Sequence, residues 1–449
     1  MRLILAFAAP LLFGFLFQQL YSFVDTAIVG RFLGAQKLAA VGATGSLSFM
    51  ILGFCSGLCS GFSIPIAQAF GARDETALRR SVTTAVCLCA GFSLLMAVLT
   101  ALLCPLLLRL MNTPEAIIGD SAAYIRIIFA AIPFTVLYNM SGSVLRSLGD
   151  SRTPVIFLVF ASATNILLDL LFILVFRWGV AGAGAATAIS QLLSGLGCLW
   201  AIRRSFPILR MSRSDWIFRP QLARRLIGIG IPMGLQFSIT AVGSVVMQWS
   251  VNGLGVNAVA AMAAGARLSM FFACVFDALA TTMATYAGQN IGAGRPDRIG
   301  QGLRAATVLG VAYCLAAFAV IMLRGRALLS LFVDEAADPA VTALGLQFLR
   351  SNGAFYIPLL FVNLFRLTVQ GVGCTRPAMF AGMFEMAARI AVALVLVPLM
   401  GFDGAVLANP AAWVLADLFL IPCYFTIMRH LQQRLGQGEL RPAVRERRV

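Results

Sequence analysis

The sequence predicts an all-α polytopic membrane protein with twelve transmembrane helices in two pseudo-symmetric six-helix bundles. Composition, block pattern and an internal repeat predict this fold. Of the 449 residues, 60% are hydrophobic and only 12% are charged, and the mean hydropathy is +0.90, whereas about a quarter of a typical soluble domain is charged. The apolar residues come in blocks of about 20 or more, the length of helices that satisfy their own backbone hydrogen bonds in lipid.

Twelve spans can be drawn along the chain. They are residues 3–29, 38–69, 81–110, 122–148, 153–176, 179–202, 226–251, 258–290, 302–323, 345–371, 377–400 and 404–428. A cleavable signal peptide is the competing interpretation of the first block. That block runs well past the apolar length of a signal peptide and is closed by no small-residue cleavage site, so we expect a membrane helix.

Lysine and arginine are unevenly divided between alternate loops. One set, which includes the amino-terminal lead, the central linker and the carboxy-terminal tail, holds 23 of these residues, and the other set holds 6. Short loops on the translocated side are depleted in both residue types. The count therefore predicts that both termini and the central linker face the cytoplasm. As a separate expectation, the location is the prokaryotic plasma (inner) membrane.

The two halves of the chain resemble each other. A shift of 221 positions aligns Gly34 with Gly255 and Gln68 with Gln289, and a shift of 222 aligns Gly179 with Gly401. Because each half has six spans, both halves enter the membrane from the same side and form parallel repeats. This duplication is typical of secondary transporters, in which a cleft between two bundles opens to either side.

The predicted domains follow from the longest polar interruption. Residues 1–202 form the first bundle and residues 226–428 the second, joined by a basic cytoplasmic linker at 203–225 and followed by a basic cytoplasmic tail at 429–449. In the linker, the apolar run Trp216-Ile-Phe lies among arginines, which favours an interfacial segment.

Several function classes are excluded. The formal net charge of +16 comes from arginines in loops and not from a basic face with interleaved aromatics, so nucleic-acid binding is not expected. The ten cysteines lie in apolar blocks without histidine or acidic neighbours at ligand spacing, so we predict no metal site. The only histidine, His430, follows the last span. No nucleotide-binding loop or hydrolase motif appears, so we predict neither an enzyme nor a bound cofactor.

Two acidic residues fall inside the first bundle without counterparts in the second. Asp25 precedes the outer-loop Arg31 by six residues, and Asp169 precedes the outer-loop Arg177 by eight. The two acids therefore differ by about 3 Å in depth and can share one pocket. An acid at membrane depth costs about 2.5 kcal/mol or more, which makes it a functional candidate. We expect the pair to titrate as a unit and to hold a proton near physiological pH.

Polar residues accompany these acids on their helices and nearby spans. Gln18 and Ser22 share a helix face with Asp25, and Asn165 shares one with Asp169. The other candidates for the lining are Tyr124, Asn139 and Thr187. The alternative is that Asp25 bridges backbone groups freed near Pro10 and Gly14, or reaches the headgroups near Arg31.

Other intramembrane charges lie in the second half. Glu385 and Arg389 stand four residues apart and most simply neutralise each other within one helix, with a gate or second-bundle role as the alternative. Asp277 and Asp417 are lone acids, each either a cation site or a structural group, for example paired with Arg267.

Several motifs resemble one transporter family. The segment from Gln18 to Gly34 with Leu38-Ala-Ala-Val-Gly resembles the first-span signature of the multidrug and toxic compound extrusion (MATE) family, and Asn165-Ile-Leu-Leu-Asp resembles the fifth-span motif of its DinF-type branch. Leu145-Arg-Ser-Leu-Gly-Asp and Leu407-Ala-Asn-Pro-Ala-Ala-Trp also resemble family motifs. The resemblance covers essentially the whole chain.

The resemblance implies a V-shaped fold and export of amphipathic, usually cationic compounds by cation antiport. It makes Asp25 the central coupling acid, with Gln18, Asn165, Asp169 and Thr187 around it, and makes Pro10 a bending point. The chain lacks the span-seven acid of the NorM-type pattern, so the proton is favoured over sodium as coupling ion. We expect a monomer in lipid whose partners are small-molecule substrates. The alternative is a lipid or lipid-linked oligosaccharide flippase of the same wider superfamily, which should line its cleft with Arg and Lys.

Overall fold

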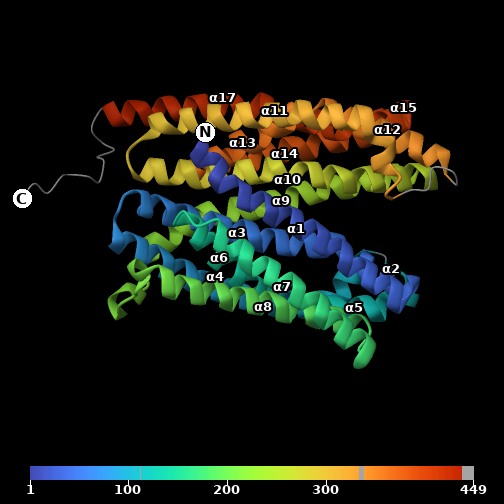
Figure 1. Ribbon diagram of the computed structural model, residues 1–449, viewed down its shortest axis with the longest axis horizontal. Coiled ribbons are helices and arrows are strands. Elements are labelled where there is room, and N and C mark those ends of the chain that lie inside the picture. The colour runs from blue at the N-terminus through green and yellow to red at the C-terminus, as the bar shows by residue number, and fades with distance from the viewer. Residues whose placement is uncertain (112, 333–337, 437–449) are drawn as a thin grey trace, which may run out of the picture. The chain divides into compact units, whose positions relative to one another are not determined.

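The computed structural model describes residues 1–111, 113–332 and 338–436, and all regular structure in these residues is helical (Figure 1). Ten helices are long and apolar enough to cross a membrane, and two bent helix pairs raise the number to twelve if each pair is one span. These helices coincide with the twelve predicted spans, so the predicted all-α fold is confirmed. Residues 437–449 of the predicted basic tail, including Arg441, Arg445, Arg447 and Arg448, lie outside the described residues.

The elements follow one another along the chain with short connections. The first half comprises α1 (Arg2–Leu33), α2 (Ala35–Ala43), α3 (Gly45–Gly71), α4 (Glu75–Leu110), α5 (Glu115–Ala130), α6 (Ile132–Ser147), α7 (Arg152–Leu170), the π-helical η1 (Leu171–Val175), α8 (Val180–Ser205) and the short 3-10 helices η2 (Pro207–Leu209) and η3 (Arg213–Trp216). The second half comprises α9 (Pro220–Asn252), α10 (Val256–Gly292), α11 (Pro296–Leu329), α12 (Pro339–Ala354), α13 (Tyr356–Val372), α14 (Thr375–Ala391), the π-helical η4 (Val392–Leu396), α15 (Val397–Met400), α16 (Phe402–Ala405) and α17 (Ala408–Gly436).

Two spans that the sequence predicted as single helices are bent. The helices α5 and α6 meet at 44°, and α12 and α13 meet at 52°. Pro133 lies in the first turn of α6. Because proline lacks a backbone N–H and its ring crowds the preceding turn, it interrupts the helix at this point.

The chain packs into two compact units. One unit is Phe13–Gly234, and the other consists of Met1–Leu12 and the described residues from Leu235 onward. Most of each predicted bundle falls in one unit, whereas the first turns of α1 and of α9 belong to the other unit. The predicted domain boundaries at 202, 226 and 428 stay a prediction.

Close helix packing explains why the start of α9 belongs to the first unit. A Cβ atom on Gly57 would lie 2.6 Å from the Met233 carbonyl oxygen, and one on Gly61 would lie 2.5 Å from Cα of Gly230. Only glycine permits this approach of α3 to α9, which is the small-residue packing typical of membrane helices.

The backbone repeats at nearly the same offset as the sequence. The two π-helical segments η1 and η4 are 221 positions apart. Gly34 and Gly255 both have φ near +90°, at +86° and +98°, and Gly179 and Gly401 have φ of +59° and +61°. Since residues with side chains rarely adopt positive φ, these glycines mark the same loop conformation in both halves.

Candidate functional site

The two intramembrane acids of the first half come together in the Phe13–Gly234 unit. Asp25 lies on α1 and Asp169 in the last turn of α7, and their carboxyl groups are within hydrogen-bonding distance of each other. Asp169 is fully buried. One oxygen of each carboxyl group, Oδ1, receives no hydrogen bond from the described residues. The depth comparison from the sequence therefore identified two side chains that meet.

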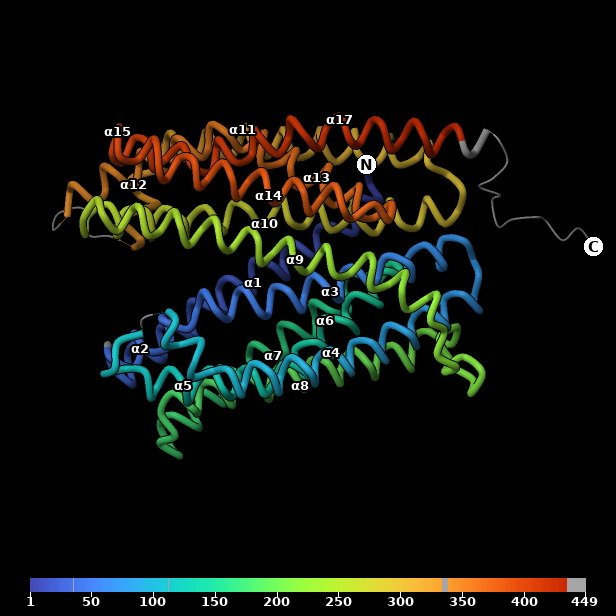
Figure 2. The backbone as a smooth tube through the Cα atoms, turned by 180° about the vertical axis from the view of Figure 1, so that it is seen from behind, coloured from blue at the N-terminus to red at the C-terminus, as the bar shows by residue number. Residues whose placement is uncertain are grey.

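Asn165 and Thr187 hold Asp169 in place. The Asn165 side chain is fully buried one turn before Asp169 on α7. With its amide nitrogen facing the carboxylate, Asn165 donates to Oδ2 of Asp169 at 2.9 Å and accepts from the Thr187 backbone N–H at 3.0 Å. This orientation satisfies both ends of the amide and links α7 to α8, which run side by side (Figures 1 and 2). The Thr187 hydroxyl donates to the Ala183 carbonyl oxygen at 3.1 Å.

Two tyrosines complete the surroundings of the acid pair. Tyr124 on α5, one of the residues considered for the lining, lies near both carboxyl groups. Tyr21 on α1 lies near the same carboxyl groups and near the Thr187 side chain. The sequence analysis did not single out Tyr21. Its position one turn before Asp25 was the signal available, because residues four apart share a helix face.

The helix α7 changes its winding two residues after Asp169. Leu171–Val175 form the π-helical segment η1, and Phe172 stacks on Trp178 with ring centroids 4.8 Å apart. Trp178 also donates its backbone N–H to the Phe172 carbonyl oxygen at 2.9 Å. Single π turns within α-helices are frequent at functional sites, and here one lies next to the acid pair.

Three residues predicted for the lining, Gln18, Ser22 and Asn139, make no hydrogen bond to the acid pair among the described residues. Gln18 and Ser22 are exposed on α1. Asn139 donates its amide N–H to the Thr135 carbonyl oxygen on its own helix at 3.0 Å. A local hydrogen bond of this kind fixes the Asn139 amide to its own helix. A role of Gln18, Ser22 and Asn139 in substrate binding stays a prediction. The described residues also contain no ion pair between Asp25 and Arg31, the alternative considered for Asp25.

The other unit contains a buried network of opposite charges. Glu385 on α14 pairs with Arg389 at 3.5 Å, as the sequence predicted, and it makes a closer contact with Arg366 on α13. Arg366 was missed because it lies 19 residues away and no spacing rule connects the two helices. Asp417 on α17 lies close to the same charges. Next to this network, Gln370 donates to the Gln236 side chain at 2.7 Å.

Asp277 is separate from this network. It lies on α10, and no ion pair joins it to Arg267 or to any other cation in the part of the chain that the structure describes. Pairing with Arg267, one of the structural roles considered for Asp277, is therefore not observed. A role for Glu385, Arg389 or Asp277 in transport stays a prediction.

Oxygen atoms dominate the site around the acid pair. The described residues contain no group of three or more His, Cys, Asp or Glu side chains arranged to hold a metal ion. The acid pair with Asn165, Thr187 and the two tyrosines offers carboxylate, amide, hydroxyl and phenol oxygens. Such a set suits a proton, or a hard monovalent cation that prefers oxygen ligands.

Comparisons with known proteins agree with this architecture. The MatE family model matches residues 10–171 and 232–395. A probable multidrug resistance protein, YpnP of Bacillus subtilis, is 32% identical over 367 residues, which cover 81% of this chain and 80% of that protein. DNA damage-inducible protein F of Escherichia coli is 27% identical over 431 residues, 92% of this chain and 88% of that protein.

A solved structure shows the same fold. The outward-facing structure of a multidrug resistance MATE family transporter superposes with a TM-score of 0.89 over 96% of each chain, at 21% sequence identity. The fold, the duplicated spans and the family model that matches most of both halves lead to one conclusion: the chain belongs to the multidrug and toxic compound extrusion (MATE) family of membrane transporters, and its relatives include the DinF protein.

Proposed function

We propose that the protein exports amphipathic cations across the prokaryotic plasma membrane by antiport with protons, and that Asp25 and Asp169 carry the coupling ion. The observation that carries this proposal is the contact between the two carboxyl groups inside a helical membrane bundle. Several relatives of the chain are named multidrug resistance or multidrug export proteins, which supports the substrate class.

The mechanism follows from the electrostatics of the pair. Two carboxylates side by side in a low-dielectric surrounding cannot both carry an unbalanced negative charge, so the pair takes up a proton or another cation. A bound proton neutralises the pair, whereas a cationic substrate needs it charged. Competition between the two ligands then couples proton entry from outside to substrate release there.

The driving force is sufficient for transport. Each charge that crosses a potential of ~100 mV contributes about 2.3 kcal/mol, and each unit of pH difference adds about 1.4 kcal/mol. Sodium is the other candidate coupling ion, since the same oxygens are suitable ligands for it. We further propose that transport proceeds by alternating access of the two units, that both termini lie in the cytoplasm and that the protein is a monomer.

The test uses purified protein in liposomes with an imposed pH gradient. We expect a panel of lipophilic cations to dissipate the gradient with the wild type and not with Asp25→Asn at equal protein content. The matched control is Asp120→Asn, which removes an acid of the same unit that pairs with Lys37 at 2.6 Å on α2. Unimpaired transport by Asp25→Asn would refute the role of the pair. If the wild type responds to no cation with either ion, the flippase alternative is favoured.

A further inference from the structure

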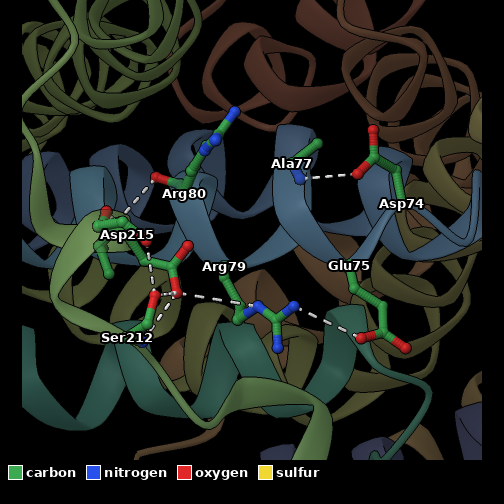
Figure 3. Close-up of polar contacts among 9 residues, drawn as sticks. Asp74, Glu75, Ala77, Arg79, Arg80, Ser212 and Asp215 are labelled. Carbon is green, nitrogen blue, oxygen red and sulfur yellow. Dashed lines mark hydrogen bonds and ion pairs between the residues drawn. The ribbon is translucent and has the colours of Figure 1, made fainter.

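The segment that connects α8 to α9 is fixed to the body of its unit. Figure 3 shows Ser212 and Asp215 of this linker beside Arg79 and Arg80 of α4. The Asp215 carboxylate accepts from the Ser212 backbone N–H at 2.8 Å and from its hydroxyl at 2.7 Å, and it lies 3.9 Å from Nε of Arg79. Thr83 donates its hydroxyl to the Asp215 carbonyl oxygen at 2.7 Å. These contacts give the linker one conformation against α4.

The linker uses only some of its apolar side chains for the core. Leu209 is buried in the hydrophobic core of the unit, and Phe206, Ile208 and Met211 pack against that core. In contrast, Trp216, Ile217 and Phe218 are 50%, 61% and 56% exposed. They follow Asp215 directly and belong to none of the candidate membrane spans. Exposed clusters of large apolar side chains mark sites that contact a membrane or another protein, and apolar residues next to arginines are typical of segments that lie in the membrane interface.

The charge around these three side chains has one sign. Residues 203–225 contain seven arginines and a single acid. That acid is Asp215, which is buried and turned towards Ser212 and Arg79. Arg203, Arg204, Arg210, Arg213, Arg224 and Arg225 are exposed. Exposed guanidinium groups beside an apolar cluster complement the phosphate groups of anionic lipids.

We propose that the linker is a binding surface for anionic phospholipids, which we call the linker surface (residues 210–219). Trp216, Ile217 and Phe218 insert between the lipids, and Arg210, Arg213 and Arg219 bind the headgroup phosphates. Asp215 positions the surface by holding it on α4 (Figure 3). This surface lies at the same end of its unit as the turn between α3 and α4 (Figures 1 and 2), and the inference does not depend on the transported substrate.

The test measures the lipids next to Trp216 in the full chain. Purified protein is reconstituted in nanodiscs that contain phosphatidylcholine and phosphatidylglycerol, with only one of the two lipids brominated in each sample. Bromine quenches tryptophan fluorescence at short range. The difference in fluorescence between the wild type and Trp216→Phe gives the signal of Trp216 alone. We expect at least about two-fold stronger quenching of Trp216 by brominated phosphatidylglycerol than by brominated phosphatidylcholine at equal mole fraction.

A charge-matched pair of variants tests the arginines. The triple change Arg210→Gln, Arg213→Gln and Arg219→Gln should make the two lipids quench equally. The control changes Arg295, Arg298 and Arg304 to Gln, removing the same charge from the amino-terminal end of α11, and should keep the preference. Equal quenching by both lipids in the wild type, an unchanged preference in the linker variant, or no quenching of Trp216 by either lipid would each overturn the proposal.

Discussion

Two buried carboxylates show how neighbours decide the role of an acid in a membrane protein. Asp169 is fully buried and faces another carboxyl group, Asp25. Glu385 is 4% exposed and lies between two guanidinium groups, those of Arg366 and Arg389. The first pair has no ion-pair partner among the described residues, so we expect it to take up a cation, whereas the charge of Glu385 is balanced by fixed charges of the protein. We therefore expect Asp169 to serve transport and Glu385 to serve stability.

The tyrosine beside the acid pair gives a graded prediction. Tyr21→Phe removes one neutral hydroxyl near Thr187 and the acid pair, and one hydrogen bond to a neutral hydroxyl contributes about 0.5 to 1.5 kcal/mol. We expect transport of lipophilic cations in liposomes to fall by about two- to ten-fold, well short of the loss in Asp25→Asn. Tyr138→Phe is the control, because Tyr138 contacts the Pro154 carbonyl oxygen at 3.5 Å. Equal loss in both variants would contradict a specific role for Tyr21.

The charge network of the other unit gives a stability prediction. Glu385→Gln leaves two buried arginines without their shared carboxylate, which costs about 3 to 5 kcal/mol. We expect a clear drop in the thermal unfolding temperature in detergent. Glu75→Gln removes the 58% exposed partner of Arg79 and should change stability by less than about 1 kcal/mol. Equal unfolding temperatures for the two variants would show that Glu385 is not required for stability.

At the scale of elements, the linker depends on one short capped helix. Ser212 and Asp215 form a reciprocal capping box around η3, and the contacts of Asp215 with Thr83 and Arg79 connect η3 to α4 (Figure 3). The helix α4 has a cap of its own. The Asp74 side chain accepts a hydrogen bond from the Ala77 backbone N–H at 2.8 Å and so caps the start of α4. Each cap satisfies backbone donors at a helix start that the helix itself leaves free.

The capping box makes the linker sensitive to acid. Hydrogen bonds from the Ser212 backbone N–H and hydroxyl hold the pKa of Asp215 below its ordinary value, with a smaller effect of Arg79. Because the pKa in the folded state is lowered, the stabilisation is present above the ordinary pKa of about 4 and is lost as the pH falls through the folded pKa.

The fluorescence emission of Trp216 reports the loss of the capping box as Asp215 is protonated. This emission is the difference between the wild type and Trp216→Phe. We expect it to be constant from neutral pH down to about pH 4 and to change below it. In Asp215→Asn the acid transition should disappear. A wild-type transition that persists in Asp215→Asn would assign it to another group.

At the scale of the whole molecule, two helices are shared by both compact units. The helix α1 changes unit between Leu12 and Phe13, and α9 changes unit between Gly234 and Leu235. Each helix contains a proline just before it changes unit. Pro10 of α1 lies two residues before Leu12, and Pro232 of α9 lies two residues before Gly234. The two prolines are 222 positions apart, close to the offset of the repeat. Because proline removes a helical hydrogen bond, these are the points where each shared helix bends most easily.

The hinge role of the two prolines is testable by transport rates. Pro10→Ala and Pro232→Ala restore a helical hydrogen bond, so we expect each to stiffen its helix and slow transport in liposomes by about ten-fold, or 1.4 kcal/mol in the barrier. Pro105→Ala is the matched control, because Pro105 lies inside α4 within one unit. If the control slows transport as much as the hinge variants, loss of proline and not hinge position is responsible.

The sequence by itself determined the membrane class, the twelve spans, the duplication and the depth of the two acids. These properties depend on local composition and on helix geometry, which convert residue number directly into length along the membrane normal.

Only the tertiary structure decided which side chains meet. Asp25 lies beside Asp169, and Tyr21 lies near both acids. The Asn139 amide donates to its own helix, and Arg366 is the nearer partner of Glu385. The structure also assigned the first turns of α1 and α9 to their units. The physical reason is that membrane helices are apolar on nearly every side, so the hydrophobic pattern along the chain does not mark the face that packs inward. The rotation of each helix follows from its close contacts with neighbours that are distant in sequence.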